Sequence, residues 1–112
     1  RDAAVLAWEQ AVAATVIHYI NYSIGDLEKV GTADFSLTTL AKHWSELKGF
    51  LIGLQFNPAS PLQNDFVAVN NLVGDQPVFT ADGKDAYIAD LESARDLMRD
   101  AYGFTQAQVA GW

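Results

Sequence analysis

The chain has 112 residues, half of them hydrophobic and 19% charged, so it is long enough for one domain with a real core and too hydrophobic to be disordered. Fourteen acidic residues against seven basic ones give a net charge of −7, which argues against nucleic acid and anionic membrane surfaces, because both attract Lys and Arg. Cysteine is absent, which excludes disulfides and thiolate metal sites.

The first predicted helix covers residues 2–30, with Gly31 as its C-terminal stop. It is apolar nearly all round, which is typical of the central helix of a bundle. A membrane span is the alternative, but Glu9, His18 and Asn21 interrupt any run of about 20 apolar residues, so no transmembrane segment is expected. The chain starts in helical register without Met or a signal region, and we expect residues 1–112 to be one domain from a longer protein.

The second predicted helix starts at Asp34 or Ser36 and ends near Gln55. Small residues recur along it every four positions, at Ala41, Ser45, Gly49 and Gly53. A glycine inside a helix costs about 1 kcal/mol relative to alanine, so something other than helix stability accounts for the two glycines. We interpret the stripe as a surface for close packing against the Ala-rich side of the first helix. The alternative is close approach of a ligand or another chain.

A short third helix is predicted from the SPLQ sequence at 60–63, in which Ser60 would be the N-cap of a capping box, and it ends at Gly74. The loop 75–83 carries Val78 and Phe79, which we expect to plug the core.

The fourth helix is predicted over residues 84–102, and a second capping box at 105–108 opens a last turn that docks Val109 and Trp112. The predicted fold is an all-α, up-and-down four-helix bundle with a short C-terminal helical turn. Its core is expected to centre on Trp8, Tyr19, Trp44, Leu51, Phe66 and Leu91.

The candidate metal ligands in the second helix are His43 and Glu46, three positions apart. Zinc or iron needs three or four converging imidazoles and carboxylates, so the remaining ligands would have to come from elsewhere. The alternative is a histidine at the edge of the core and an unrelated surface carboxylate. If His43 ligates a metal ion, we expect another His, Asp or Glu within about 5 Å of it, and we expect these side chains to surround a polar cavity.

His18, on the small-residue side of the first helix, is the third candidate ligand. A histidine on a buried helix is more often hydrogen-bonded to a carbonyl or a side chain. Its side of the helix is expected to face the second helix, which would bring His18 toward His43.

Residues 43–50 (HWSELKGF) and 54–58 (LQFNP) resemble an imelysin-like domain of unknown function from bacterial envelope proteins. Residues 94–104, with Trp112, resemble the C-terminal end of that group. The resemblance touches most of the chain. It implies the C-terminal helical part of a larger protein, with the missing N-terminal segment or a second copy as partner.

Members of the wider imelysin family are all-helical, carry Gly-x-His-x-x-Glu, are secreted or anchored as lipoproteins, and are linked to iron uptake. His43 and Glu46 match the motif, and position 41 is Ala instead of Gly. The resemblance implies a bacterial envelope location, periplasmic or anchored at the outer membrane, and a non-enzymatic domain that binds iron or an iron-bearing ligand. Two alternatives stay open: a metallopeptidase that uses zinc or iron at His43 and Glu46, and a purely structural or interaction bundle.

Overall fold

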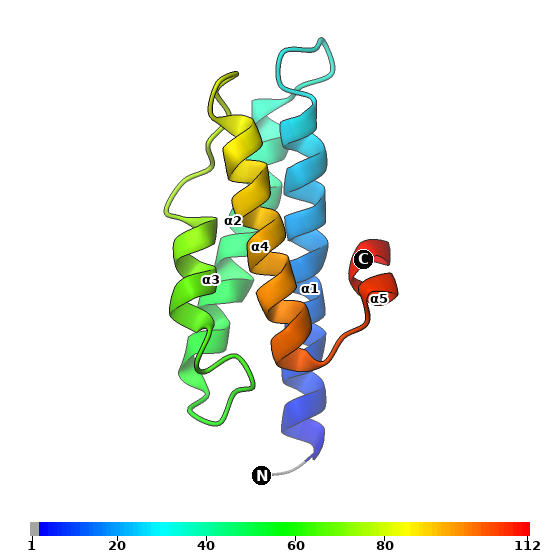
Figure 1. Cartoon of the computed structure of the whole chain (residues 1–112), viewed down its shortest axis with the longest axis vertical. Coiled ribbons are helices and arrows are strands. Elements are labelled where there is room, and N and C mark those ends of the chain that lie inside the picture. The colour runs from blue at the N-terminus through cyan, green and yellow to red at the C-terminus, as the bar shows by residue number, and fades with distance from the viewer. Residues whose placement is uncertain (1–2) are drawn as a thin grey trace.

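The computed structural model describes residues 3–112, and helices follow one another along this whole part of the chain (Figure 1). The elements are α1 (Ala3–Glu28), α2 (Leu37–Gly53), the 3-10 helix η1 (Leu54–Phe56), α3 (Phe66–Val73), α4 (Lys84–Tyr102) and α5 (Gln106–Gly111). Helices α1 to α4 run alternately up and down, and α5 lies against α1 and α4. The predicted all-α bundle with a short C-terminal helix is confirmed.

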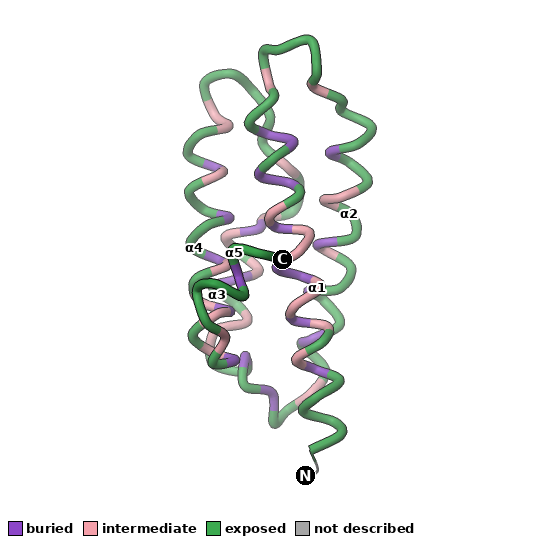
Figure 2. Tube along the Cα trace, turned by 90° about the vertical axis from the view of Figure 1, so that its right-hand side faces the viewer, coloured by how far each residue is buried: buried purple, intermediate pink, exposed green. Residues whose placement is uncertain are grey.

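The core is made of aliphatic side chains from every long helix, seen in Figure 2 as buried positions that recur once per turn. Its largest fully buried members are Ile17, Ile20, Leu27, Leu40, Leu47, Leu51, Leu62, Leu91 and Met98. Of the residues predicted to centre the core, Leu51 and Leu91 are fully buried, while Tyr19, Trp44 and Phe66 are half-buried at its edge.

Trp8 was predicted in the core and is 61% exposed, so that prediction is wrong. The first two turns of α1 extend past the ends of the neighbouring helices, and residues 3–8 are all exposed (Figure 2). The apolar pattern of α1 therefore continues beyond the length that the other helices can cover. The core-facing side chain one position later is that of Glu9, which is only 1% exposed.

Most helix ends follow the predicted capping residues. Ser36 caps α2 by accepting a hydrogen bond from the Thr39 N–H, and Thr105 forms both bonds of a capping box. Gly31 and Gly103 have φ of +87° and +71°, the left-handed conformation that favours glycine after a helix. The predicted start of the first helix at residue 2 lies outside the described residues.

The capping box predicted at Ser60 is wrong, because α3 begins six residues later, at Phe66. The hydroxyl of Ser60 accepts the Leu62 N–H at 3.0 Å and donates to a carboxylate oxygen of Glu9 at 2.6 Å. Residues 61–65 form turns, in which the Gln63 N–H donates to the Ser60 carbonyl at 3.0 Å and the Asp65 N–H donates to the Leu62 carbonyl at 2.8 Å. The loop 75–83 does not plug the core either: Val78 and Phe79 each stay 38% exposed.

The small-residue stripe of α2 does not pack against α1, contrary to the prediction. Ala41, Ser45, Gly49 and Gly53 are all exposed, and an added Cβ at either glycine would find open space within 4 Å. The Ala-rich side of α1 is also mostly solvent-facing. Aromatic side chains take part in the contact between the two helices, with Tyr19 stacked on Phe50 at a centroid distance of 6.2 Å. That the stripe serves a ligand or another chain stays a prediction.

Replacing Gly49 or Gly53 with Ala is expected to stabilise the domain by about 1 kcal/mol each, because alanine fits the open space and favours the helix. The midpoint of urea unfolding measures this. Gly103→Ala is the control and should destabilise, because its φ of +71° strains any L side chain. A loss of stability in Gly49→Ala would mean that this surface is covered in solution.

By length and composition, α1 could also cross a membrane, with a mean hydropathy of 1.3 over its most apolar window. In this structure it packs against α2, α4 and α5 and buries the polar residues Glu9, Ser23 and Asp26. These contacts make α1 a helix of the bundle, and the expectation that it does not cross a membrane stays a prediction.

Candidate functional site

His43 lies half-buried beside α1, with its Nδ1 atom 2.6 Å from Oδ2 of Asp26. Asp26 is 8% exposed, so this carboxylate is held inside the α1–α2 contact. An ionised carboxylate only accepts hydrogen bonds, so Nδ1 of His43 donates. In the neutral imidazole, Nε2 on the opposite side of the ring then keeps a free lone pair. A carboxylate orients metal-ligating histidines in this way, and Asp26 meets the distance that ligation requires of a neighbour.

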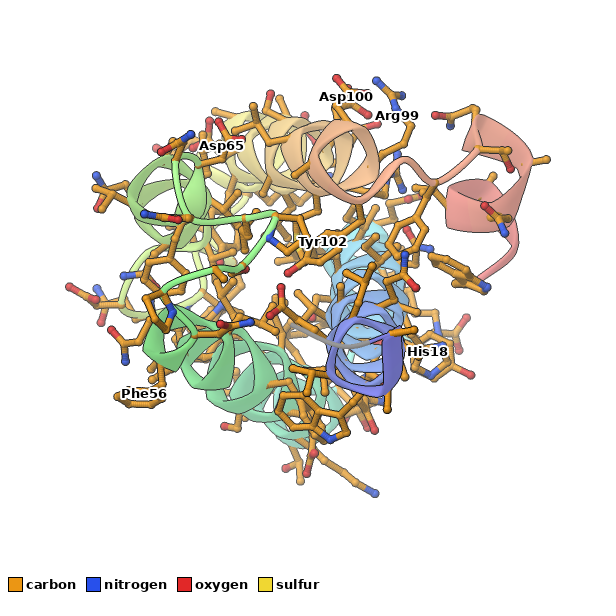
Figure 3. All side chains as sticks on the ribbon, turned by 90° about the horizontal axis from the view of Figure 1, so that it is seen from below. His18, Phe56, Asp65, Arg99, Asp100 and Tyr102 are labelled. Carbon is orange, nitrogen blue, oxygen red and sulfur yellow. The ribbon has the colours of Figure 1, made fainter. Side chains whose placement is uncertain are left out.

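His18 is fixed in the same tautomer by a different partner. Its Nδ1 atom lies 2.7 Å from the main-chain oxygen of Trp112, and a carbonyl oxygen can only accept. Nε2 of His18 is again the nitrogen without a proton when the ring is neutral. Figure 3 shows His18 on the side of α1 that faces α5, so the C-terminal helix positions this imidazole.

Tyr22 links the two histidines on the outer face of the bundle. Its ring centroid lies 4.1 Å from that of His18 and 4.9 Å from that of His43, and the residue is 47% exposed. Tyr19 lies 5.1 Å from His18 and 6.1 Å from His43. The structure thus brings both histidines of the chain to one face, with two tyrosines between them.

Two hollows lie side by side on this face and share Tyr22. The aromatic hollow, about 510 Å³, is lined by Ala14, Thr15, His18, Tyr19, Tyr22, Gly111 and Trp112. The polar hollow, about 330 Å³, is lined by Asn21, Tyr22, Gly25, Asp26, Lys29, Thr39 and His43. Each hollow contains one histidine, so a ligand that spans Tyr22 contacts both.

Glu46 is not part of this face. It is exposed and lines a third hollow of about 270 Å³ with Ser45, Gly49 and Phe50. Its carboxylate makes no hydrogen bond or ion pair within residues 3–112. His43 turns toward Asp26 on α1 while Glu46 points to solvent, so the two motif residues are separated although they are one turn apart.

Within residues 3–112, no group of three or more His, Cys, Asp or Glu side chains could hold a metal ion. Comparisons with protein-family models, curated proteins and solved structures found no match for this chain. A metal role for His43, Glu46 or His18 therefore stays a prediction that depends on the geometry described above.

Sequence reasoning missed Asp26, Tyr22 and Trp112 as parts of the site. One signal was present: positions 19, 22 and 26 are spaced by three and four, which places Tyr19, Tyr22 and Asp26 on one side of α1. No sequence signal could have identified the main-chain oxygen of Trp112, because its place depends on how α5 folds back.

A second polar cluster, also missed, surrounds Glu9 inside the bundle. Glu9 Oε1 accepts from Asn57 Nδ2 at 2.5 Å, and Oε2 accepts from the hydroxyls of Ser60 at 2.6 Å and Tyr102 at 2.8 Å. Figure 3 shows Tyr102 pointing from α4 into the bundle. Burial, together with the hydrogen bond to Glu9, raises the pKa of Tyr102 above its ordinary value, so the phenol stays a donor. Glu9, Ser60 and Tyr102 are buried and Asn57 is half-buried, so the cluster joins α1, α4 and the loop before α3 inside the bundle.

Proposed function

We propose that this domain is a non-enzymatic binding module for a transition metal ion carried by a small chelating ligand. The observation that carries the proposal is the His43–Asp26 pair at 2.6 Å, whose imidazole lines the polar hollow. Because Asp26 holds Nδ1, Nε2 is the nitrogen available to a metal.

A chelated ion fits this site better than a bare one. A bare zinc or iron ion takes at least three or four protein ligands, and this face offers two imidazoles. A chelator brings its own donors and leaves a coordination position for His43.

The imelysin resemblance supports the same proposal and extends it to iron as the metal and the bacterial envelope as the location. A peptidase is less well supported, because hydrolysis by zinc needs a metal held by three protein ligands with an open position for water. The carboxylate that would act as general base, Glu46, lines a different hollow from His43.

The test is calorimetric titration of the domain with iron(III) nitrilotriacetate, a chelate with free coordination positions. Binding by the wild type is expected, with at least a tenfold loss in His43→Ala. Asp26→Asn should weaken binding about 10- to 100-fold, because it loses the carboxylate that orients the imidazole. Circular dichroism shows whether each variant is folded.

Glu46→Gln distinguishes this site from the sequence motif. We expect it to bind as the wild type does, since Glu46 faces another hollow. A loss in Glu46→Gln equal to that in His43→Ala would place the metal between the motif residues and contradict the site described here. Unchanged binding in His43→Ala would contradict the proposed function.

A further inference from the structure

We infer that the ligand is a planar aromatic chelate, whose aromatic part occupies the aromatic hollow while its metal ion meets His43 across Tyr22. The inference rests on the proposed function and names the chemical class of its ligand.

The aromatic hollow is shaped to accept a flat ring. Four of its lining residues carry rings, namely Tyr19, Tyr22, Trp112 and His18, and Ala14 and Gly111 are small. The hollow is shallow and open to solvent, so a flat group can enter it from outside. Such side chains bind planar groups by stacking and by edge-to-face contact.

The polar hollow suits the metal end of the same ligand. Its titratable and charged groups are Asp26, Lys29, His43 and Tyr22. One oxygen of Asp26 binds Nδ1 of His43, which leaves Nε2 of the imidazole as the nitrogen donor for the metal. Lys29 is exposed and is placed to meet any acidic group of the chelator.

Tyr22 lies between the two hollows and lines both of them. Its ring contacts both imidazoles, at 4.1 Å and 4.9 Å, so a ligand lying over it reaches both. At 47% exposure, Tyr22 is accessible to a ligand from solvent. A ligand with the same metal but no ring would use His43 alone and leave the aromatic hollow unfilled.

The experiment compares copper(II) 2,2′-bipyridine with copper(II) ethylenediamine by calorimetric titration. Both complexes carry two positive charges and a bidentate pair of nitrogen donors, and only the first is planar and aromatic. We expect the bipyridine complex to bind about tenfold more tightly, since each aromatic contact contributes a two- to tenfold gain. Tyr22→Leu should reduce this preference, because it removes the ring that lines both hollows.

The controls separate this inference from the proposed function. Phe56→Leu removes a ring that is 75% exposed and lines neither hollow, and should change nothing. Equal binding of both complexes, with both lost in His43→Ala, overturns the aromatic ligand and leaves metal-chelate binding supported. A preference that Tyr22→Leu leaves undiminished overturns the role of Tyr22. Lack of binding to either complex, or binding that His43→Ala leaves intact, overturns both proposals.

Discussion

Replacing Glu9 with Ala is expected to lower the free energy of unfolding by about 3 kcal/mol or more, the largest effect we expect from any polar side chain described here. The change leaves three donors in the bundle without an acceptor, on Asn57, Ser60 and Tyr102. Each unpaired buried donor costs about 1–3 kcal/mol. The three donors come from the α2–α3 loop and from α4, so the loss also loosens their attachment to α1.

The orientation of the donors explains why a carboxylate is needed. Asn57 Oδ1 accepts the Ala59 N–H at 3.0 Å, which points its NH₂ group at Glu9. Ser60 Oγ accepts the Leu62 N–H, which leaves the hydroxyl proton for Glu9. Glu9→Gln keeps the shape but replaces one acceptor oxygen with a donor. We expect it to cost about 1–3 kcal/mol, less than Glu9→Ala.

Urea unfolding followed by circular dichroism measures both variants. The matched control is Glu28→Ala, at the exposed end of α1, which should stay within about 0.5 kcal/mol of the wild type. A double-mutant cycle of Glu9→Gln with Tyr102→Phe should show coupling, because the two groups share a hydrogen bond. Stability of Glu9→Ala equal to that of the control would show that water replaces the carboxylate at no cost.

The fold could be predicted where a pattern is local. The bounds of α4, residues 84–102, follow from one apolar stripe and a terminal glycine, and the structure has the same bounds. Ser60 shows the limit of such reasoning. Its sequence context is that of a helix cap, and its oxygen accepts the Leu62 N–H, but the helix starts only at Phe66. Its hydroxyl proton goes to Glu9, 51 positions away, a contact that no local pattern indicates.

The candidate site could be predicted only in part, because the contacts that complete it join residues far apart in the sequence. His43 and His18 were identified as chemically capable residues, and both line hollows of one face. The pairing of His43 with Asp26 joins residues 17 positions apart on two helices, and the rotation of α2 decides it. That rotation follows from the large aliphatic stripe of Leu40, Leu47 and Leu51, which turns Glu46 and the small residues to solvent.

Tyr87→Phe is expected to cost about 2 kcal/mol at neutral pH, and this cost should shrink as the pH rises. The hydroxyl of Tyr87 donates to the Val73 carbonyl at 2.6 Å and accepts from Trp44 Nε1 at 2.7 Å. Val73 is the last residue of α3, where helix carbonyls lack intrahelical partners. Phenylalanine removes both bonds, each with a net value of about 1 kcal/mol.

The pH dependence follows from the protonation of the phenol. Burial raises the pKa of Tyr87 from 10.0 to about 12, against a smaller opposing effect of the Trp44 hydrogen bond. The folded state therefore holds the proton more tightly than the unfolded state. The stability this provides is complete below pH 10 and is lost as the pH rises from 10 to about 12. Phenylalanine has no such proton, so the wild type should lose its advantage across this interval.

Urea unfolding of wild type and Tyr87→Phe at neutral pH and near pH 12 measures the change, and the difference between them should fall by up to about 2 kcal/mol. Tyr22→Phe is the matched control, because the Tyr22 hydroxyl makes no hydrogen bond within residues 3–112. Its stability should follow that of the wild type at both pH values. A constant difference between wild type and Tyr87→Phe would mean that Tyr87 ionises equally easily in the folded chain, and that its hydroxyl is open to water.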